Sequence, residues 1–401
     1  MRSARAATWL LPTALVFAPA AGAELGDPIR GLSAEELQRF RDGRTAFETV
    51  EDVADGLGPV FNGTSCAGCH NVGATGGGSD TIETRFGRIV DGVFDPLASR
   101  GGSLIQTSGI GAAGACIFVG EQVPPEATIV AGRRTTSLFG LGLVDAVPDA
   151  DVIALAAHEA QMQPDTAGRP NMVLDIVTGA AAVGKFGWKS QVPNLLQFSG
   201  DAYLNEMGIT TPLFPDENCP QGACDLLACD PVPGVDDDLD DVDAFRDFMT
   251  FLAPPSTGLD VRAALHVRHP RRSAAREATS DGIRLFAALG CASCHVPSLT
   301  TGPSPTPALD HVRFSPYSDF LLHDMGSLGD GIEQGQARGA EMRTAPLWGV
   351  RLLTTFLHDG RATTIEDAIL AHDGQAAPAR TRFAGLRAAE RVMLVAFLRT
   401  L

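Results

Sequence analysis

The sequence predicts a mainly α-helical protein of two tandem domains with long loops, and three observations lead to this fold class. A pentapeptide occurs twice, as Cys66-Ala-Gly-Cys-His70 and as Cys291-Ala-Ser-Cys-His295. A longer phrase follows each copy, at residues 134–143 and again at residues 343–352. Both halves then end in a segment whose apolar residues have helical spacing. An internal duplication, with one helical domain in each half, explains all three observations.

The repeated pentapeptide is the C-x-x-C-H attachment signature of c-type haem. In this motif both thiols become bonded to the porphyrin, and the histidine that follows binds the iron. The predicted cofactors are therefore two covalently bound c-type haems, and each domain is predicted to be cytochrome c-like. The predicted attachment residues are Cys66, Cys69, Cys291 and Cys294, and the predicted proximal iron ligands are His70 and His295.

The chain begins with the pattern of a secretory signal peptide at residues 1–23. Arg2 and Arg5 precede an apolar stretch, and Ala21-Gly-Ala23 is a small-residue cleavage site. The apolar stretch is too short to cross a bilayer, and no later stretch is long enough. These features predict export to a bacterial periplasm without an integral membrane segment.

The remaining chain divides at a segment rich in Pro, Ser and Gly. Residues 24–255 are predicted to form the N-terminal domain, 256–275 the linker and 276–401 the C-terminal domain. Pro254 and Pro255 cannot continue the helix that precedes them. Because the distance from haem motif to repeated phrase is greater in the first half, the N-terminal domain is expected to carry an insertion.

The formal net charge of −17 argues against binding to nucleic acid or to an anionic membrane. It is compatible with docking of a basic redox partner, and equally with a role in solubility alone. Four cysteines outside the haem motifs suggest up to two disulfides in an oxidising compartment, with the pairing left open. These cysteines are Cys116, Cys219, Cys224 and Cys229.

An acidic run at residues 236–243 is the densest cluster of charge in the chain. Its carboxylates could hold Ca²⁺, although the run lacks the glycine-bearing spacing of an EF-hand loop. A solvated first turn of the helix that follows explains the same residues, because carboxylates stabilise helix N-termini. Both interpretations stay open at this point.

The ligand on the second face of each haem determines whether that haem transfers electrons or binds a small oxidant. When the two halves are aligned, Trp188 takes the place of His358, and the region from Ala202 to Glu206 takes the place of His372. We therefore predict that His372 is the second ligand of the His295 haem, and that the His70 haem has no second histidine. Met325 is the rival second ligand of the His295 haem, although methionine more often packs in a core.

Three residues near this alignment are candidates for chemistry at the first haem. Glu206 could transfer a proton between the oxygens of bound peroxide, and Gln197 could hydrogen-bond the same oxygens. Trp188 could pass an electron between the two haem-bearing segments. Each also has an ordinary interpretation: Glu206 as an exposed acid, Gln197 as a surface amide and Trp188 as a core aromatic. The position of all three within the same aligned region favours the functional interpretation.

Several phrases of the chain resemble one family, the bacterial di-haem cytochrome c peroxidases, and in particular their di-haem oxidoreductase branch. These phrases include Lys185-Phe-Gly-Trp-Lys189, Glu206-Met-Gly-Ile-Thr-Thr-Pro-Leu-Phe214, Leu321-Leu-His-Asp-Met-Gly326 and Phe356-Leu-His-Asp-Gly-Arg361. The resemblance implies a catalytic haem in the N-terminal domain and Ca²⁺ between the domains. It also implies electron relay by Trp188 and peroxide handling by Gln197 and Glu206.

The sequence departs from the family pattern at two places. The peroxidases carry a methionine where this chain has His372, which implies a second haem of lower potential, because thioether ligation raises the potential. They also carry a histidine about sixteen residues after the first proximal one, and this chain has none there. The first haem is therefore expected to be open without activation.

Two classes of function follow from the sequence. In the first, a periplasmic enzyme takes electrons from a small redox protein at the His295 haem and passes them through Trp188. The His70 haem then reduces a peroxide-like small substrate, with Glu206 as acid and base. In the second, the protein is an electron carrier with no chemistry of its own. A maturase-like oxidant of other proteins is a further alternative, and a homodimer is compatible with the sequence.

Overall fold

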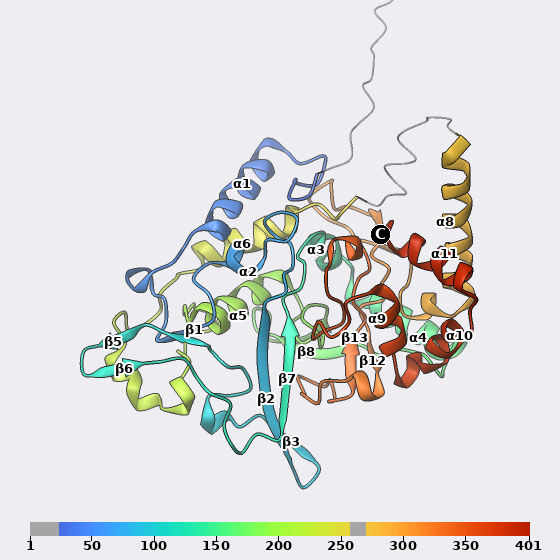
Figure 1. Ribbon diagram of the computed structural model, residues 1–401. Helices are drawn as coiled ribbons and strands as arrows, with labels where there is room; N and C mark the ends of the chain where they lie inside the picture. The colour runs from blue at the N-terminus through green and yellow to red at the C-terminus, as the bar shows by residue number, and fades with distance from the viewer. Residues whose placement is uncertain (1–23, 257–269) are drawn as a thin grey trace, which may run out of the picture.

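The computed structural model describes residues 24–256 and 270–401, with the backbone alone for 270–278 (Figure 1). The predicted signal peptide and most of the predicted linker lie outside these residues. Within them, no helix is both long and apolar enough to cross a membrane. The division into two domains stays a prediction.

The first and last helices of each half pack against each other. In the first half, α1 (Ala34–Glu48) lies against α6 (Asp240–Phe251), and in the second, α8 (Pro270–Ala288) lies against α11 (Ala388–Leu398) (Figure 1). A capping box at Ser33 starts α1, since its hydroxyl accepts from the Glu36 amide while the Glu36 carboxylate accepts from the Ser33 amide. The repeated pairing is what an internal duplication predicts.

Six further α-helices and eight 3₁₀ helices complete the helical part of the described chain. The α-helices are α2 (Cys66–Cys69), α3 (Leu141–Asp145), α4 (Asp149–Met162), α5 (Leu195–Met207), α9 (Ile365–Ala371) and α10 (Ala377–Ala384). The 3₁₀ helices are η1 (Val53–Asp55), η2 (Ala98–Arg100), η3 (Pro220–Gly222), η4 (Cys224–Cys229), η5 (Cys291–Ser293), η6 (Gly326–Leu328), η7 (Val350–Leu352) and η8 (Gly374–Ala376).

The prediction of a mainly α fold was wrong, because the described chain also forms thirteen strands in six small sheets. The strands are β1 (Val60–Phe61), β2 (Ile82–Val90), β3 (Val93–Asp95), β4 (Ser108–Gly109), β5 (Gly111–Ala113), β6 (Cys116–Phe118), β7 (Ile129–Arg134), β8 (Asn171–Asp175), β9 (Ala180–Gly184), β10 (Leu299–Thr300), β11 (Arg313–Phe314), β12 (Leu322–Asp324) and β13 (Glu341–Arg343). Most have two to five residues, too few for a clear alternation of apolar and polar side chains. They lie in the long segments between the helices, which the sequence analysis took for loops.

The largest sheet has the order β3-β2-β7 and is antiparallel throughout. Its longest pairing joins Ile82 to Arg134 and continues to Gly87 opposite Ile129. This sheet places Glu83 and Arg85 on one face together with Arg133, because side chains two apart on a strand, and those directly opposite, share a face. It runs down the middle of the molecule in Figure 1.

One large apolar core is shared by both halves. It contains Phe47, Phe245 and Phe248 of the first half together with Phe320 and Trp348 of the second. A smaller core around Phe286, Phe383 and Phe397 belongs to the second half alone. The two halves are therefore packed against each other through apolar side chains.

The duplicated loops of the two halves meet at the centre of the molecule. Phe186 forms a bridge with Val192, and Phe356 forms the equivalent bridge with Ala362. Each loop receives a backbone hydrogen bond from the repeated phrase of the other half. The amide of Arg134 donates to the carbonyl of His358 at 2.7 Å, and the amide of Arg343 donates to that of Trp188 at 2.9 Å. The halves thus contact each other through an approximately two-fold exchange of the same elements.

Candidate haem sites

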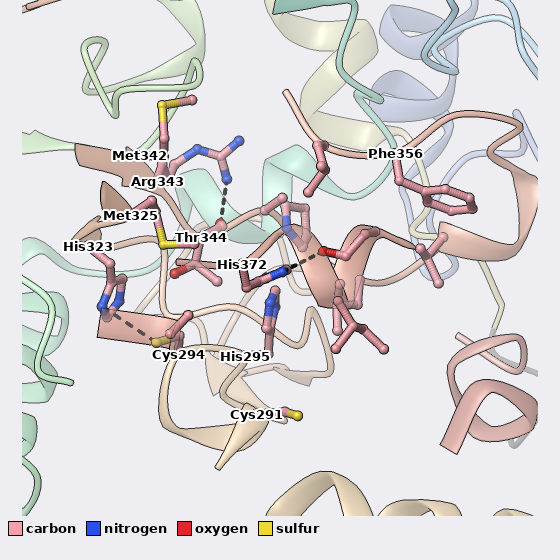
Figure 2. Close-up of a pocket in the computed structure, with 18 of the residues that line it drawn as sticks. Cys291, Cys294, His295, His323, Met325, Met342, Arg343, Thr344, Phe356 and His372 are labelled. Atoms are coloured by element: carbon pink, nitrogen blue, oxygen red, sulfur yellow. Dashed lines mark hydrogen bonds between the residues drawn. The ribbon is translucent and has the colours of Figure 1, made fainter. Parts of the chain in front are cut away.

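The second pentapeptide opens onto a cavity of about 880 Å³ (Figure 2). Gly290, with a φ of +88°, lies between α8 and η5 and turns the chain so that Cys291, Cys294 and His295 all line this cavity. A left-handed φ is unstrained for glycine alone among ordinary residues. The size of the cavity is within the range of cofactor sites in proteins.

His295 and His372 face each other across this cavity, as Figure 2 shows, with ring centroids 6.4 Å apart. The Nδ1 atom of His295 lies 3.0 Å from the carbonyl of Tyr317, and that of His372 lies 2.8 Å from the carbonyl of Ala368. Hydrogen bonds of this kind fix the ring and leave Nε2 free for a metal.

The spacing of the two rings fits an iron between them. Two imidazole nitrogens bound at about 2 Å to one metal ion bring the ring centroids to about 6.3 Å. Burial lowers the pKa of His295 to about 4 and also lowers the pKa of His372, so both rings are neutral, as a metal ligand must be. Met325 lies beside Thr344 and His323 in Figure 2, whereas His372 is the residue that faces His295.

Cations line the cavity and suit the carboxylates of a haem. They come from both halves and are Arg134, Lys185, Arg343, Arg380 and Arg382. Among the described residues, the Arg343 guanidinium donates to two backbone carbonyls, those of Gly187 and Thr344, and burial lowers its pKa to about 10. Charged hydrogen bonds of such groups to carboxylates are strong in a buried site. The residues present therefore fit a haem held by two histidines.

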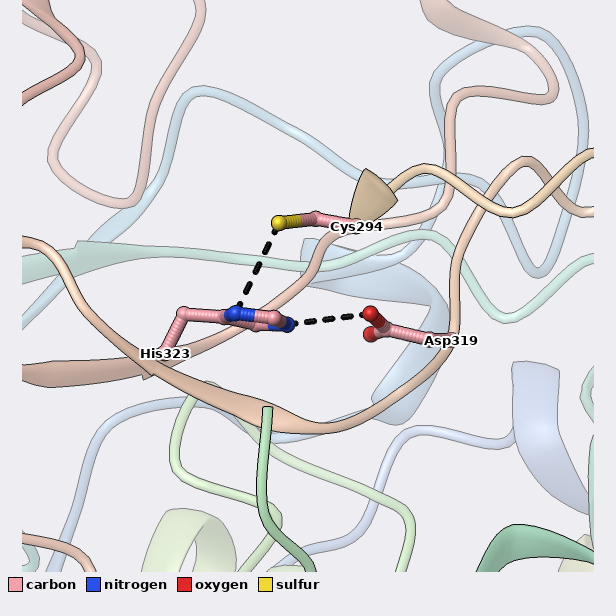
Figure 3. Close-up of side chains that lie close together, drawn as sticks. All are labelled: Cys294, Asp319 and His323. Atoms are coloured by element: carbon pink, nitrogen blue, oxygen red, sulfur yellow. Dashed lines mark hydrogen bonds and ion pairs between the residues drawn. The ribbon is translucent and has the colours of Figure 1, made fainter. Parts of the chain in front are cut away.

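A third histidine, missed by the sequence analysis, contacts the attachment cysteine (Figure 3). The Nδ1 atom of His323 lies 3.5 Å from Cys294 Sγ, and its Nε2 atom lies 2.9 Å from Asp319 Oδ2. These atoms are close enough to share a metal ion. A Cys294 thiol used for haem attachment is no longer a thiolate ligand, however, so we interpret the group as part of the haem surroundings. Its sequence signal was the phrase at residues 321–326.

The first pentapeptide has the same local form. Ser65 caps α2 by accepting from the Gly68 amide, and the chain then turns at His70. The His70 Nδ1 atom lies 3.2 Å from the carbonyl of Gly77, and burial lowers the pKa of the ring to about 4. The Phe47 ring packs 6.0 Å from it. His70 is therefore prepared for a metal as His295 is.

The four cysteines of the two motifs are free, and the other four form disulfides. Cys116 is bonded to Cys229 and Cys219 to Cys224, which resolves the pairing that the sequence left open.

The second face of the first site differs from that of the second site. Ala202 stands sixteen residues after Phe186 on α5, as His372 stands sixteen residues after Phe356. An alanine side chain has no donor atom for iron, so the position equivalent to His372 offers no ligand in the first half.

Glu206 lies one turn beyond Ala202 and reaches the segment before the first motif. The amides of Asn62 and Gly63 donate to its backbone carbonyl at 2.8 and 3.0 Å, and Asn62 Nδ2 donates to its Oε2 at 3.0 Å. Burial first, and the neighbouring carboxylate of Glu83 second, raise the pKa of Glu206 to about 7. The charge of Glu206 in turn adds to the effect of burial in raising the pKa of Cys69.

Gln197 does not share this environment. Its Nε2 atom donates to the carbonyl of Leu174, and its Oε1 atom accepts from the amide of Ile176. Nine residues along a helix are two and a half turns, which places Gln197 and Glu206 on opposite faces of α5. The structure thus does not bring the two predicted residues together, and the amide of Gln197 is used to hold the end of β8.

Trp188 lies between the two sites. It lines the cavity of the second site, and its ring meets that of His358 edge-on at 6.2 Å. Its Nε1 atom donates to the carbonyl of Arg134 at 3.0 Å. Two residues beyond Arg134, the backbone of Thr136 lies close enough to the His70 ring to act against the lowering of its pKa.

The acidic run at residues 236–243 holds backbone groups. Asp236 accepts from the amide and hydroxyl of Thr210, and Asp237 accepts from the amides of Leu239 and Asp241. In the part of the chain that the structure describes, no three carboxylates of this run lie close enough together to share an ion. The run is used to anchor the start of α6.

A family described as "Di-haem oxidoreductase, putative peroxidase" matches residues 125–401 of the chain. No curated protein matches it. Among solved structures, a MauG-like protein associated with microbial copper homeostasis is 17% identical, with a TM-score of 0.40 over 99% of this chain and 95% of that one. The diheme peroxidase BthA from Burkholderia thailandensis E264 is also 17% identical, with a TM-score of 0.42 over 97% and 95% of the two chains.

Proposed function

Because the chain belongs to the di-haem oxidoreductase family, and is thus a haem-dependent oxidoreductase of peroxidase type, we propose a division of labour between its two sites. Electrons enter at the His295 site and pass to the His70 site, where a peroxide is reduced. We further propose that both haems are attached covalently through the two motifs, and that the protein acts in the periplasm.

The observation that carries this proposal is the difference between equivalent positions of the two halves. His372 faces His295, whereas the equivalent position of the first half holds Ala202. A haem supplies an iron that exchanges electrons and, where one axial position is open, accepts a small oxidant. The second site offers two ligands and suits electron transfer, while the first offers one and suits chemistry.

Glu206 is the group that holds a proton at the first site. With a pKa raised to about 7, its carboxyl is about half protonated at neutral pH, and it can both give and take a proton. Asn62 orients it through the bond to Oε2. Reduction of hydrogen peroxide to two waters consumes two electrons and two protons, so a proton donor is required beside the open face.

Trp188 connects the two sites. It forms part of the wall of the second cavity, and its indole hydrogen bond leads to the strand end that continues to the His70 ring. We propose that electrons follow this path. A small basic redox protein is the proposed electron donor, since the chain carries a net charge of −17.

An EPR and optical spectrum of the oxidised protein, recorded before and after addition of H₂O₂, tests the proposal. A high-spin ferric signal that disappears or changes on addition of peroxide is the expected result. Two low-spin signals that do not respond to peroxide would contradict it and favour an electron carrier. Steady-state peroxide reduction by Glu206→Gln adds a second test, because turnover equal to that of the unaltered protein would exclude Glu206 as the proton donor.

A further inference from the structure

Starting from the proposed function of the first site, we propose that its proton donor is a pair of carboxyl groups, Glu83 and Glu206, which share one proton, and that Arg85 positions this pair. Neither Glu83 nor Arg85 stood out in the sequence, and both lie outside the residues that match the family. The proposal adds a second acid to the site and a cation that sets its charge.

The two carboxyl groups meet although they come from distant parts of the chain. Glu83 is the second residue of β2, and Glu206 lies in the last turn of α5. Their carboxyl groups lie within hydrogen-bonding reach of each other. Two ionised carboxylates have no proton to share, so a hydrogen bond between them requires that one is protonated.

Both members of the pair are anchored by further hydrogen bonds. Arg85 Nε donates to Glu83 Oε1 at 3.0 Å, and Asn62 Nδ2 donates to Glu206 Oε2 at 3.0 Å. The Glu83 and Arg85 side chains share a face of β2 because they are two residues apart. Asn62 is fixed in turn, since its Oδ1 accepts from the amide of Thr107 at 2.9 Å. The pair therefore cannot separate without breaking these contacts.

The charges around the pair leave room for one proton. Burial raises the pKa of Asp201, which lies beside Arg85 and Glu83 on the helix that carries Glu206. From the sheet, Arg133 faces Glu83 and helps to lower its pKa. Arg133 is also paired with Asp330 at 2.7 Å, but Asp330 is shared with Lys189, so this group keeps a net positive charge. Three acids (Glu83, Glu206 and Asp201) therefore lie near two positive charges, that of Arg85 and that of the Arg133 group, and one proton balances them.

The directions of the pKa shifts place the shared proton on Glu206. Burial raises the pKa of Glu83, but the Arg85 guanidinium outweighs it and leaves that pKa lowered. The pKa of Glu206 is raised, by burial and by the charge of Glu83. Two interacting carboxyl groups with pKa values moved apart are the arrangement that keeps one proton near neutral pH.

Such a pair suits the reduction of a peroxide. When the O–O bond breaks, one oxygen leaves as water after it receives the proton of Glu206. The other oxygen becomes a second water, with two electrons from the donor protein by way of the second site and one further proton from solvent. The pair is then doubly charged, with Arg85 as counter-charge, and it takes up one proton from solvent before the next turnover. Glu83 makes this uptake favourable, because its charge raises the proton affinity of Glu206.

The test uses the full chain with both haems and follows the protonated carboxyl by its infrared carbonyl band as a function of pH. The band of Glu206 is identified by its loss in Glu206→Gln. In Glu83→Gln the neighbouring charge is gone, so the titration midpoint of this band is expected to fall by about one pH unit or more. In Arg85→Gln the counter-charge is gone, and the midpoint is expected to rise by a similar amount. Glu217→Gln removes another buried carboxyl with a raised pKa, outside the site, and serves as the matched control.

Opposite shifts in the two variants support the pair, and a midpoint that stays at the unaltered value in both would overturn it. The low-spin spectrum of the second haem reports whether each variant is folded. The affinity of the first site for fluoride gives a second readout, because a neutral carboxyl donates a hydrogen bond to the bound anion and a carboxylate repels it. The pH midpoint of fluoride binding should fall in Glu83→Gln and rise in Arg85→Gln, as the midpoint of the infrared band does. If both midpoints shift as expected but the protein does not reduce peroxide, the carboxyl pair is supported and the proposed function is refuted. Failure of the pair and failure of the proposed function are therefore distinguishable.

Discussion

Lys189 is the residue whose replacement should destabilise the contact between the two halves most clearly. Its ammonium group donates to the carbonyls of Arg338 at 3.0 Å, of Gly339 at 3.1 Å and of Glu341, and it pairs with Asp330 Oδ1 at 2.9 Å. Both side chains of the ion pair are fully buried. Lys189→Met keeps the shape of the chain and removes the charge, so that three carbonyls lose their donor and Asp330 keeps Arg133 alone.

Removal of one partner from a buried ion pair costs about 3–5 kcal/mol of unfolding free energy. The entropy of unfolding is about 2.1 cal/mol/K per residue, or roughly 0.8 kcal/mol/K for a chain of this length that melts as one unit. The expected drop in melting temperature is therefore about 4–6 °C. Differential scanning calorimetry of the haem-loaded protein measures it.

Arg44 provides the control, because its ion pair lies on the surface of α1. Its guanidinium pairs with Glu48 at 2.9 Å, and both side chains are more than 40% exposed, so Arg44→Met should cost about 1 kcal/mol or less. If Lys189→Met melts within about 1 °C of the unaltered protein, the buried cation does not hold the halves together and the reasoning is refuted.

Four further predictions concern the sites and the disulfides. His372→Met should raise the midpoint potential of the second haem by on the order of 100 mV in a redox titration, because a thioether replaces an imidazole; an unchanged potential would mean that His372 is not its ligand. Trp188→Phe should slow electron transfer from the second haem to the first in stopped-flow reduction while both potentials stay the same, and equal rates would exclude this path. If proton donation by Glu206 limits peroxide turnover, the turnover rate should fall as the pH rises through about 7, because Glu206 loses its proton there. A turnover rate that stays constant between pH 6 and 8, roughly one unit to each side of this pKa, would argue against Glu206 as the proton donor. Removal of the Cys116–Cys229 disulfide by paired alanine substitution should cost about 2–5 kcal/mol in denaturant unfolding, because the bond closes a loop of more than a hundred residues; a smaller loss would indicate residual order in the unfolded chain.

The comparison of the two halves was the most productive step of the sequence analysis. It placed Trp188 opposite His358 and the region from Ala202 to Glu206 opposite His372, and the structure shows equivalent bridged loops around Trp188 and His358. Residues at equal spacing within two copies of a duplicated unit take equivalent places in the fold, because the same local segment forms in each copy. The prediction of a mainly α fold failed for the complementary reason, since short strands such as β5 and β6 depend on partners and have little pattern of their own.

Gln197 and Glu83 show the limit of reasoning from spacing. Gln197 was grouped with Glu206 because it precedes it by nine residues, yet helix periodicity turns the two to opposite faces. Glu83 is far from Glu206 in the chain and was not considered, yet its carboxyl contacts that of Glu206. A sequence shows which residues are near one another along the chain, and a site is formed by those that are near in space.

The sequence by itself determined the two haem motifs, the duplication and the lack of a histidine at the position equivalent to His372, because each is a matter of residue type at short range. Tertiary structure alone decided that His372 faces His295, that Cys116 is bonded to Cys229, and that Glu83, Arg85 and Asn62 surround Glu206. These contacts join segments separated by tens to hundreds of residues. They form because packing of the shared core brings buried polar groups together, and such groups must find partners once water is excluded.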